Sequence, residues 1–167
     1  QCARAADTQE VRLHVHRHDP RKALLYVINH APGEKETDKL HSVLAYRVEA
    51  GRLVLKDSLT SPILTSPNDL FALPDGTVYV SNDSSARGGL MELILGLKRS
   101  TVVRFDPRSG EWSVAIDKLA MANGIYIEDD YLYLAVTREN AVYRYPFLPD
   151  GGLGERLKLA DVKSADN

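Results

Sequence analysis

The stretch TVYVSND, residues 77–83, is rich in β-branched and aromatic residues around a central tyrosine, a composition typical of a short strand. Two similar stretches occur elsewhere in the chain: LLYVINH at 24–30 and YLYLAVT at 131–137. Their central tyrosines are spaced 53 and 54 residues apart: Tyr26, Tyr79 and Tyr133. A regular period of this size predicts an architecture built by stacking one supersecondary unit or by repeating it around an axis.

Each repeat also contains turn signals that divide it into short strands. In NDLFALPDGTVYVSND, residues 68–83, the turn Pro74-Asp75-Gly76 separates two strands, because Pro presets φ and Gly accepts a positive φ. Further hairpins are expected to turn at 49–51, 106–110 and 149–152. Each unit is therefore predicted to hold four short antiparallel strands, which is one blade of a β-propeller.

The predicted fold class is all-β, a β-propeller of the six-bladed type of which about three blades are present. Residues 1–10 are expected to form a flexible leader, and residues 11–167 a partial propeller domain. Its blades are expected at about 11–60, 61–119 and 120–167. Propellers usually close with about 4–8 blades, so three would leave open edges. The chain is thus expected to be half of a larger propeller or to form a homodimer that closes one.

An insertion interrupts the second unit. In SARGGLMELILGLKRS, residues 85–100, apolar side chains recur with helical spacing: Leu90, Leu93, Ile94 and Leu97. This pattern predicts a short amphipathic helix over Gly89–Lys98 with one apolar face. A lid or a packing helix is the expected role, rather than a membrane anchor.

Composition excludes several classes of protein. A net charge of −2 gives no electrostatic reason to bind nucleic acid or an anionic membrane, and no run of apolar residues approaches the ~20 that span a bilayer. The single cysteine, Cys2, rules out a disulfide within the chain but leaves the compartment open. The first ten residues, QCARAADTQE, lack the apolar core of a signal peptide, so the localisation is unassigned.

Two asparagines mark corresponding places in the repeat. Asn68 and Asn123 are 55 residues apart, and each stands at the beginning of a predicted strand. One polar residue per blade, always at the same strand end, would form a polar ring around the axis and suggests a metal site. Each asparagine alone could equally be an ordinary turn residue. Asn82 and Asp83, at the end of a predicted strand, are expected to form a turn; lining the mouth of the central tunnel is the alternative.

Several segments resemble the paraoxonase/arylesterase family. They are LLYVINHAP, SPNDLFALPDGTVYVSND, MELILGLKRSTVVRFDP, MANGIYI and the terminal ADN, and together they cover about residues 20–167 in order. The amphipathic insertion ending in LGL is the most specific of them. The gluconolactonase (senescence-marker) and strictosidine-synthase families are broader relatives that share the asparagines. The resemblance implies a six-bladed, calcium-dependent propeller that hydrolyses small-molecule aryl esters and lactones, and animal members of the family are secreted or membrane-associated.

The resemblance also implies roles for individual residues. Asn68, Asn123, Asp166 and Asn167 match four ligands of the family's catalytic calcium. Asp69 matches a ligand of a second, structural calcium, and is otherwise a local turn cap. His30, in the VINH element, matches one of two active-site histidines. The family's remaining acidic ligands would lie upstream of this sequence.

The chemistry of calcium is compatible with such a site. Calcium takes about 6–8 oxygen ligands from carboxylates, amide carbonyls and water. Neutral asparagine ligands keep the negative charge of the site low, so the ion can polarise an ester carbonyl. A histidine above the ion can accept a proton from the attacking water.

One segment departs from the family pattern. The family's other active-site histidine would fall near 11–13, where this chain has Val-Arg-Leu and no glycine. This departure motivates a second hypothesis, in which the chain is a non-catalytic, truncated propeller segment. A third hypothesis is a gluconolactonase-like enzyme that prefers sugar lactones and accepts other divalent ions.

Overall fold

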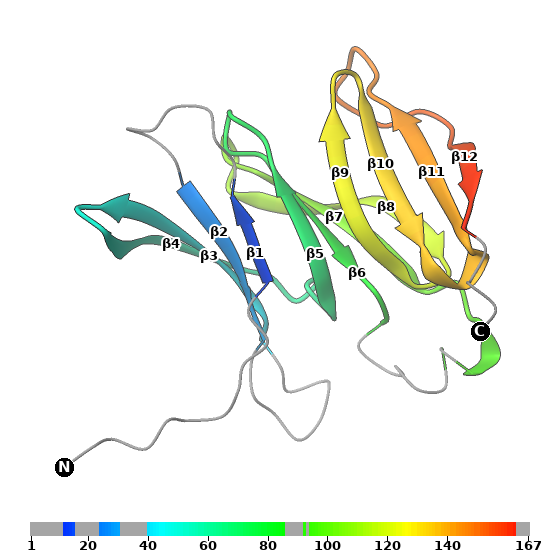
Figure 1. The fold of residues 1–167 in the computed structure, drawn as a ribbon, viewed down its shortest axis with the longest axis horizontal. Coiled ribbons are helices and arrows are strands. Elements are labelled where there is room, and N and C mark those ends of the chain that lie inside the picture. Colours follow the sequence, from blue (N-terminus) through cyan, green and yellow to red (C-terminus); the bar gives the residue numbers. More distant parts are fainter. Residues whose placement is uncertain (1–11, 16–23, 31–39, 86–91, 93, 163–167) are drawn as a thin grey trace.

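The computed structural model describes residues 12–15, 24–30, 40–85, 92 and 94–162. They form three four-stranded sheets that follow one another along the chain (Figure 1). The first sheet contains β1 (Arg12–Val15), β2 (Leu24–Asn29), β3 (Ser42–Glu49) and β4 (Arg52–Thr60). The second contains β5 (Pro67–Ala72), β6 (Val78–Asn82), β7 (Ser100–Asp106) and β8 (Glu111–Leu119). The third contains β9 (Ala122–Glu128), β10 (Tyr131–Val136), β11 (Ala141–Pro146) and β12 (Leu157–Asp161).

Each sheet is an antiparallel meander in which every strand pairs with the next along the chain. The first strand of the second sheet, β5, contacts β1 of the sheet before it and β9 of the sheet after it. The first strands of the three sheets are therefore the inner strands of consecutive propeller blades. This arrangement confirms the predicted all-β partial propeller, and β2, β6 and β10 are the three repeated tyrosine stretches.

The turn between β3 and β4 shows how local sequence ends a strand. Ala50 and Gly51 both have positive φ values, 48° and 76°. Two consecutive residues in this region match the right-handed twist of a two-stranded ribbon, which is why tight hairpins favour them. Glycine takes this conformation without strain. The hairpin predicted at 49–51 is therefore present.

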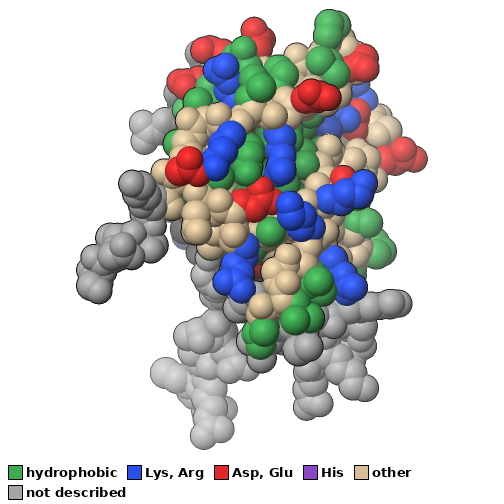
Figure 2. Space-filling view, turned by 90° about the vertical axis from the view of Figure 1, so that its right-hand side faces the viewer, with side chains coloured by type: hydrophobic (Ala, Val, Ile, Leu, Met, Phe, Trp, Pro, Cys, Tyr) green, Lys and Arg blue, Asp and Glu red, His purple; other side chains and the backbone are tan. Residues whose placement is uncertain are grey.

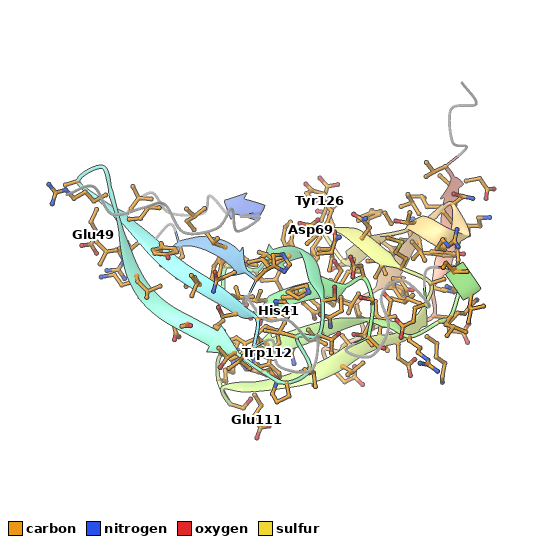
Figure 3. All side chains as sticks on the ribbon, turned by 90° about the horizontal axis from the view of Figure 1, so that it is seen from below. His41, Glu49, Asp69, Glu111, Trp112 and Tyr126 are labelled. Atoms are coloured by element: carbon orange, nitrogen blue, oxygen red, sulfur yellow. The ribbon has the colours of Figure 1, made fainter. Side chains whose placement is uncertain are left out.

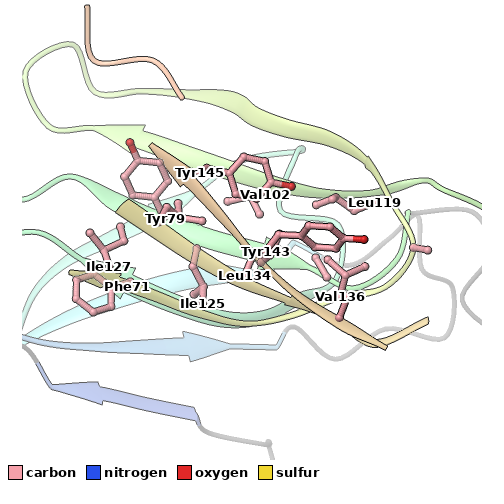
Figure 4. Close-up of a cluster of buried hydrophobic side chains, with 14 residues drawn as sticks. Phe71, Tyr79, Val102, Leu119, Ile125, Ile127, Leu134, Val136, Tyr143 and Tyr145 are labelled. Carbon is pink, nitrogen blue, oxygen red and sulfur yellow. The ribbon is translucent and has the colours of Figure 1, made fainter. Parts of the chain in front are cut away.

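The core lies between the sheets and consists of two clusters. The cluster between the second and third sheets is drawn in Figure 4, and strands of both sheets contribute to it. The cluster between the first and second sheets contains Tyr26, Ile28, Val43, Ala45, Leu64, Leu70, Ala72, Val78, Val80 and Val103. All five residues of β6 are buried, so both of its faces are covered, as its apolar sequence indicates. In β10 every second residue is buried, so one face is covered more than the other.

The inserted helix ends earlier than predicted, and Ile94 of its predicted apolar stripe is exposed. Within Gly89–Lys98, the described helical residues are Glu92, Ile94 and Leu95, and Leu90 and Leu93 lie outside the described residues. Ile94 is 61% exposed, whereas Glu92 is only 6% exposed. The Glu92 carboxylate accepts hydrogen bonds from the backbone N–H and the hydroxyl of Ser85. The prediction that Ile94 belongs to a packed stripe is therefore wrong, because specific hydrogen bonds bury the acidic residue instead.

A partly buried carboxylate ties the third sheet to the segment after the insertion. Glu139 lies in η2, a 3₁₀ turn over Thr137–Glu139, and accepts a 2.6 Å hydrogen bond from the hydroxyl of Tyr143. It also pairs with Arg156 at 3.2 Å and Lys98 at 3.3 Å. Burial opposes ionisation of Glu139, but the Tyr143 hydrogen bond and the two cations outweigh it and hold the carboxyl pKa below its usual value.

The outer edge of the third sheet is charged. Strand β12 is exposed along its whole length, and Lys158 pairs with Asp161 on it. The side of the molecule that includes β12 shows basic and acidic side chains interspersed (Figure 2). Charges on an edge strand discourage unwanted pairing with other sheets. In the described part of the chain, no helix is long and apolar enough to cross a membrane.

Candidate functional site

Asn68 lies at a β-bulge near the start of the inner strand of the second sheet. Pro67 pairs with Asn82 and Asp69 pairs with Ser81, so Asn68 is an additional residue between two consecutive partners. A bulge of this kind bends the strand and changes the direction of a side chain, and such bulges are frequent beside active sites. Asn68 is partly buried.

Asn123 lies at a corresponding bulge in the third sheet. Ala122 pairs with Val136 and Ile125 pairs with Leu134, so Asn123 and Gly124 share a single opposite residue, Ala135. Strands β5 and β9, which carry the two bulges, contact each other. The repeat in sequence therefore corresponds to a repeat of backbone geometry on two adjacent inner strands. The sequence predicts both asparagines at strand beginnings, which is where the bulges occur.

Ser81 connects the two bulges. Its hydroxyl donates to the backbone carbonyl oxygen of Asn123 at 2.6 Å and accepts the backbone N–H of Asp69 at 3.1 Å. Ser81 is completely buried, so water cannot replace either bond without a structural change. The position of Asn123 is thus determined by a side chain of the neighbouring sheet.

Asp69 makes a second connection between the same two strands. One carboxylate oxygen, Oδ2, accepts the backbone N–H of Ile125 at 3.0 Å, and the other, Oδ1, accepts the N–H of Leu70 at 2.9 Å. Asp69 therefore joins β5 to β9, a contact that turn chemistry alone would not produce. Figure 3 labels Asp69 beside Tyr126 of β9, where these two sheets meet.

Asp83, for which the sequence favours a turn, is a functional candidate in the structure. Its Oδ2 accepts the side-chain N–H of Asn68 at 3.3 Å, while Oδ1 accepts hydroxyl hydrogens from Ser66 at 2.6 Å and Ser84 at 3.0 Å. Because Asp83 holds the amide nitrogen of Asn68, the amide oxygen of Asn68 is directed away from this carboxylate. The carboxylate is thus a fixed anion beside the asparagine. The turn predicted from the sequence accounts only for the backbone of Asp83, whose N–H donates to the carbonyl oxygen of Ser66.

A sequence signal for Asp83 exists in the repeat itself. Aligning the three repeated stretches on their tyrosines places His30, Asp83 and Thr137 at the same position, just after β2, β6 and β10. Sheets that repeat around an axis bring corresponding strand ends to the same side of the molecule. His30 and Asp83 therefore belong to the same edge of the partial propeller.

His30 has a second histidine as its neighbour. The ring centroids of His30 and His41 are 5.2 Å apart, with the ring planes at 82°. The register of β2 with β3, in which Asn29 pairs with Ser42, brings the residues flanking these strands together. His41 is buried, lies directly before β3 and is labelled in Figure 3. The sequence reading did not single out His41, because the contact forms only when β2 and β3 pair.

The remaining predicted ligands, Asp166 and Asn167, lie outside the described residues. Among the residues that the structure describes, no group of three or more His, Cys, Asp or Glu is arranged to hold a metal ion. The residues with oxygen-bearing side chains at and beside the bulges are Asn68, Asp69, Asp83 and Asn123. Hard oxygen donors of this type suit calcium or magnesium better than thiophilic metals.

A family model matches most of the chain. Residues 38–167 match the family model described as the SMP-30/Gluconolactonase/LRE-like region. Among solved structures, one similar protein is described as a presumed gluconolactonase, with 17% identity and a TM-score of 0.48. The match covers 84% of this chain and 60% of that protein, so this chain spans less than two thirds of that protein's length. No curated protein matches the chain.

Proposed function

Since the chain belongs to the SMP-30/gluconolactonase/LRE-like family, we propose that it supplies part of a metal-dependent lactone hydrolase whose site lies at the inner strand ends of the propeller. The observation that carries the proposal is the pair of bulged asparagines, Asn68 and Asn123, on the adjacent strands β5 and β9. The finer proposal is a calcium-dependent hydrolase of aryl esters and lactones, as the paraoxonase resemblance implies.

The donor set fits a hard divalent cation. The amide oxygens of Asn68 and Asn123 would be its ligands in the described region, and Asp166 and Asn167 would complete the set if the family resemblance holds. A bound calcium ion would act as a Lewis acid that polarises the carbonyl of the substrate. Asp83 would hold Asn68 in its orientation and add negative charge near the cation.

His30 is the proposed base of the reaction. A neutral imidazole nitrogen of His30 would accept a proton from the water that attacks the carbonyl carbon, and would later return it to the leaving oxygen. His41, edge-on to His30 at 5.2 Å, would restrict the rotation of that ring. Asp69, whose carboxylate joins the two sheets through the N–H of Ile125, would also be a ligand of the structural calcium that the resemblance implies.

Calcium binding and turnover test the proposal separately. Calorimetric titration of the chain with calcium is expected to show one saturable site, which Asn68→Ala and Asn123→Ala each weaken by at least about tenfold. Asn140→Gly is the matched control, because Asn140 already has a positive φ of 45° that glycine accommodates. Unchanged calcium affinity in both Asn68→Ala and Asn123→Ala would reject the metal site.

Substrates distinguish the proposed activities. Phenyl acetate, a γ-lactone and a sugar lactone are assayed with and without a chelator, followed by addition of calcium, magnesium, manganese or zinc. If the chelator stops hydrolysis of phenyl acetate and only calcium restores it, the result supports a calcium-dependent hydrolase of aryl esters. Preference for the sugar lactone with several ions supports a gluconolactonase-like enzyme, which the family match favours. Calcium binding without hydrolysis of any of the three substrates supports the hypothesis of a non-catalytic propeller segment.

A further inference from the structure

Ser100, the first residue of β7, is a buried serine that holds the strand carrying Asn123. Its hydroxyl oxygen accepts the backbone N–H of Ala122 at 2.7 Å, and the hydroxyl itself donates to the backbone carbonyl oxygen of Asn82. Ser100 is 1% exposed, so water does not compete for these bonds. Ser81 bonds to the carbonyl oxygen of Asn123 itself. The two serines therefore fix the backbone before and after the Asn123 side chain.

Asn82, the last residue of β6, holds the segment that leads to Asn68. Its side-chain nitrogen donates to the carbonyl oxygen of Ile63 at 2.9 Å and to the hydroxyl of Thr101 at 3.0 Å. Its amide oxygen accepts the backbone N–H of Ser66 at 3.2 Å. Asn82 is fully buried, and both its amide hydrogens and its amide oxygen form hydrogen bonds. The loop between β4 and β5 is therefore tied to the end of β6.

Ser66 connects Asn82 to Asp83, the carboxylate that holds Asn68. The hydroxyl of Ser66 donates to Oδ1 of Asp83 at 2.6 Å, and its carbonyl oxygen accepts the backbone N–H of Asp83 at 2.9 Å. Asp83 in turn accepts the side-chain N–H of Asn68 at 3.3 Å. The orientation of the Asn68 amide therefore depends on Asn82 through two intermediates, Ser66 and Asp83.

We propose that Asn82 and Ser100 are positioning residues of the proposed metal site, Asn82 for Asn68 and Ser100 for Asn123. The inference rests on the proposed function, because it concerns a cation that binds both asparagines. The two sets of bonds meet at Asn82, whose side chain belongs to one set and whose carbonyl oxygen belongs to the other. Buried networks whose members are all hydrogen-bonded are rigid. Ligands that are already held in place lose less freedom when the cation binds, so the affinity is higher.

Amide hydrogen exchange of the metal-free chain tests both links without calcium. Ser100→Ala removes the acceptor of the Ala122 N–H, and Asn82→Ala removes the acceptor of the Ser66 N–H. Each amide is expected to exchange about tenfold faster in its own variant. Ser109→Ala, at an exposed serine in the turn between β7 and β8, is the matched control and should change neither amide. Unchanged exchange of the Ala122 and Ser66 amides in their own variants would overturn the proposal.

Calorimetric titration with calcium tests whether these links serve the metal site. Ser100→Ala and Asn82→Ala are each expected to weaken calcium affinity by about 10–100-fold, the usual cost of removing a residue that orients a ligand. Ser109→Ala should bind calcium as the native chain does. A native chain that binds no calcium would reject the proposed function. A native chain that binds calcium no more tightly than the Ser100→Ala and Asn82→Ala variants would reject the positioning role alone.

Double variants separate positioning from a general loss of stability. If Ser100 acts through Asn123, Ser100→Ala should cause no further loss of calcium affinity in an Asn123→Ala chain and its full loss in an Asn68→Ala chain. Asn82→Ala should show the reverse, a full loss with Asn123→Ala and none with Asn68→Ala. Ser66→Ala, at a partly buried residue, replaces Asn82→Ala in this comparison if that variant does not fold. Equal losses in both backgrounds would indicate a merely structural effect and would overturn the proposal.

Discussion

The hydroxyl of Ser81 donates a 2.6 Å hydrogen bond to the backbone carbonyl oxygen of Asn123, and this bond joins β6 to the inner strand of the next sheet. The same hydroxyl oxygen accepts the backbone N–H of Asp69. One buried side chain therefore satisfies backbone groups on both strands that carry the asparagine bulges. Hydroxyl groups can both donate and accept, which is why a serine serves this position.

Replacing this serine is expected to weaken the junction between the second and third sheets. Ser81→Ala leaves the Asn123 carbonyl and the Asp69 N–H without the hydroxyl, which costs about 1–3 kcal/mol of unfolding free energy. Denaturant unfolding measures the loss. Ser113→Ala, at an exposed serine on β8, is the control and is expected to change stability by less than about 0.5 kcal/mol. Equal effects of the two substitutions would contradict the role of Ser81.

Asp83 is expected to affect metal binding through Asn68. Asp83→Asn keeps the shape of the side chain but removes its charge, so calcium affinity should fall by about 10–100-fold. Calorimetry measures this affinity, and Asp150→Asn provides a control at an exposed carboxylate in the turn between β11 and β12. If both variants bind calcium equally well, Asp83 takes no part in the site.

His30 and His41 are expected to differ in their kinetic effects. His30→Gln removes the proposed base and should lower kcat by about 10²–10⁴-fold without changing calcium affinity. His41→Asn should cause a smaller loss and shift the pH profile of kcat, because it acts on the neighbouring ring. Hydrolysis rates across pH, together with calorimetry, measure both effects. A fully active His30→Gln variant would remove this residue from the mechanism.

Glu139 should make stability dependent on pH. Its carboxyl pKa is lower in the folded chain than in the unfolded chain, so its contribution is present above the unfolded value of about 4.3. The contribution is lost as pH falls through the lower, folded pKa. Glu139→Gln should cost about 1–2 kcal/mol at pH 7, since its side chain is 14% exposed while its cationic partners are more open to water.

The pH series separates charge from packing at Glu139. The difference in unfolding free energy between native chain and Glu139→Gln should shrink as pH falls below about 4.3. Tyr143→Phe removes the 2.6 Å hydrogen bond while leaving both cations in place, and should retain part of the pH dependence. A difference that stays constant from pH 7 to pH 3 would show that ionisation of Glu139 contributes nothing.

Much of the fold could be predicted because its signals are local. The strands β2, β6 and β10 follow from their β-branched and aromatic residues, and the turn at 49–51 from the tolerance of Gly51 for positive φ. The insertion shows the limit of such signals. Its helical period is a local property. The buried side of the helix, however, depends on Ser85, because hydrogen bonds from Ser85 hold Glu92 inside, and Ile94 is left exposed.

The sequence by itself determined the repeat, the strand composition of each sheet, and the two asparagines that recur with it, because these depend on neighbouring residues and on a fixed period. Only the tertiary structure decided that Ser81 holds Asn123, that Asp83 holds Asn68, and that His41 faces His30. Each of these contacts joins residues that lie in, or directly beside, different strands. Their partners are chosen by strand register and sheet packing, which no local pattern of residues encodes.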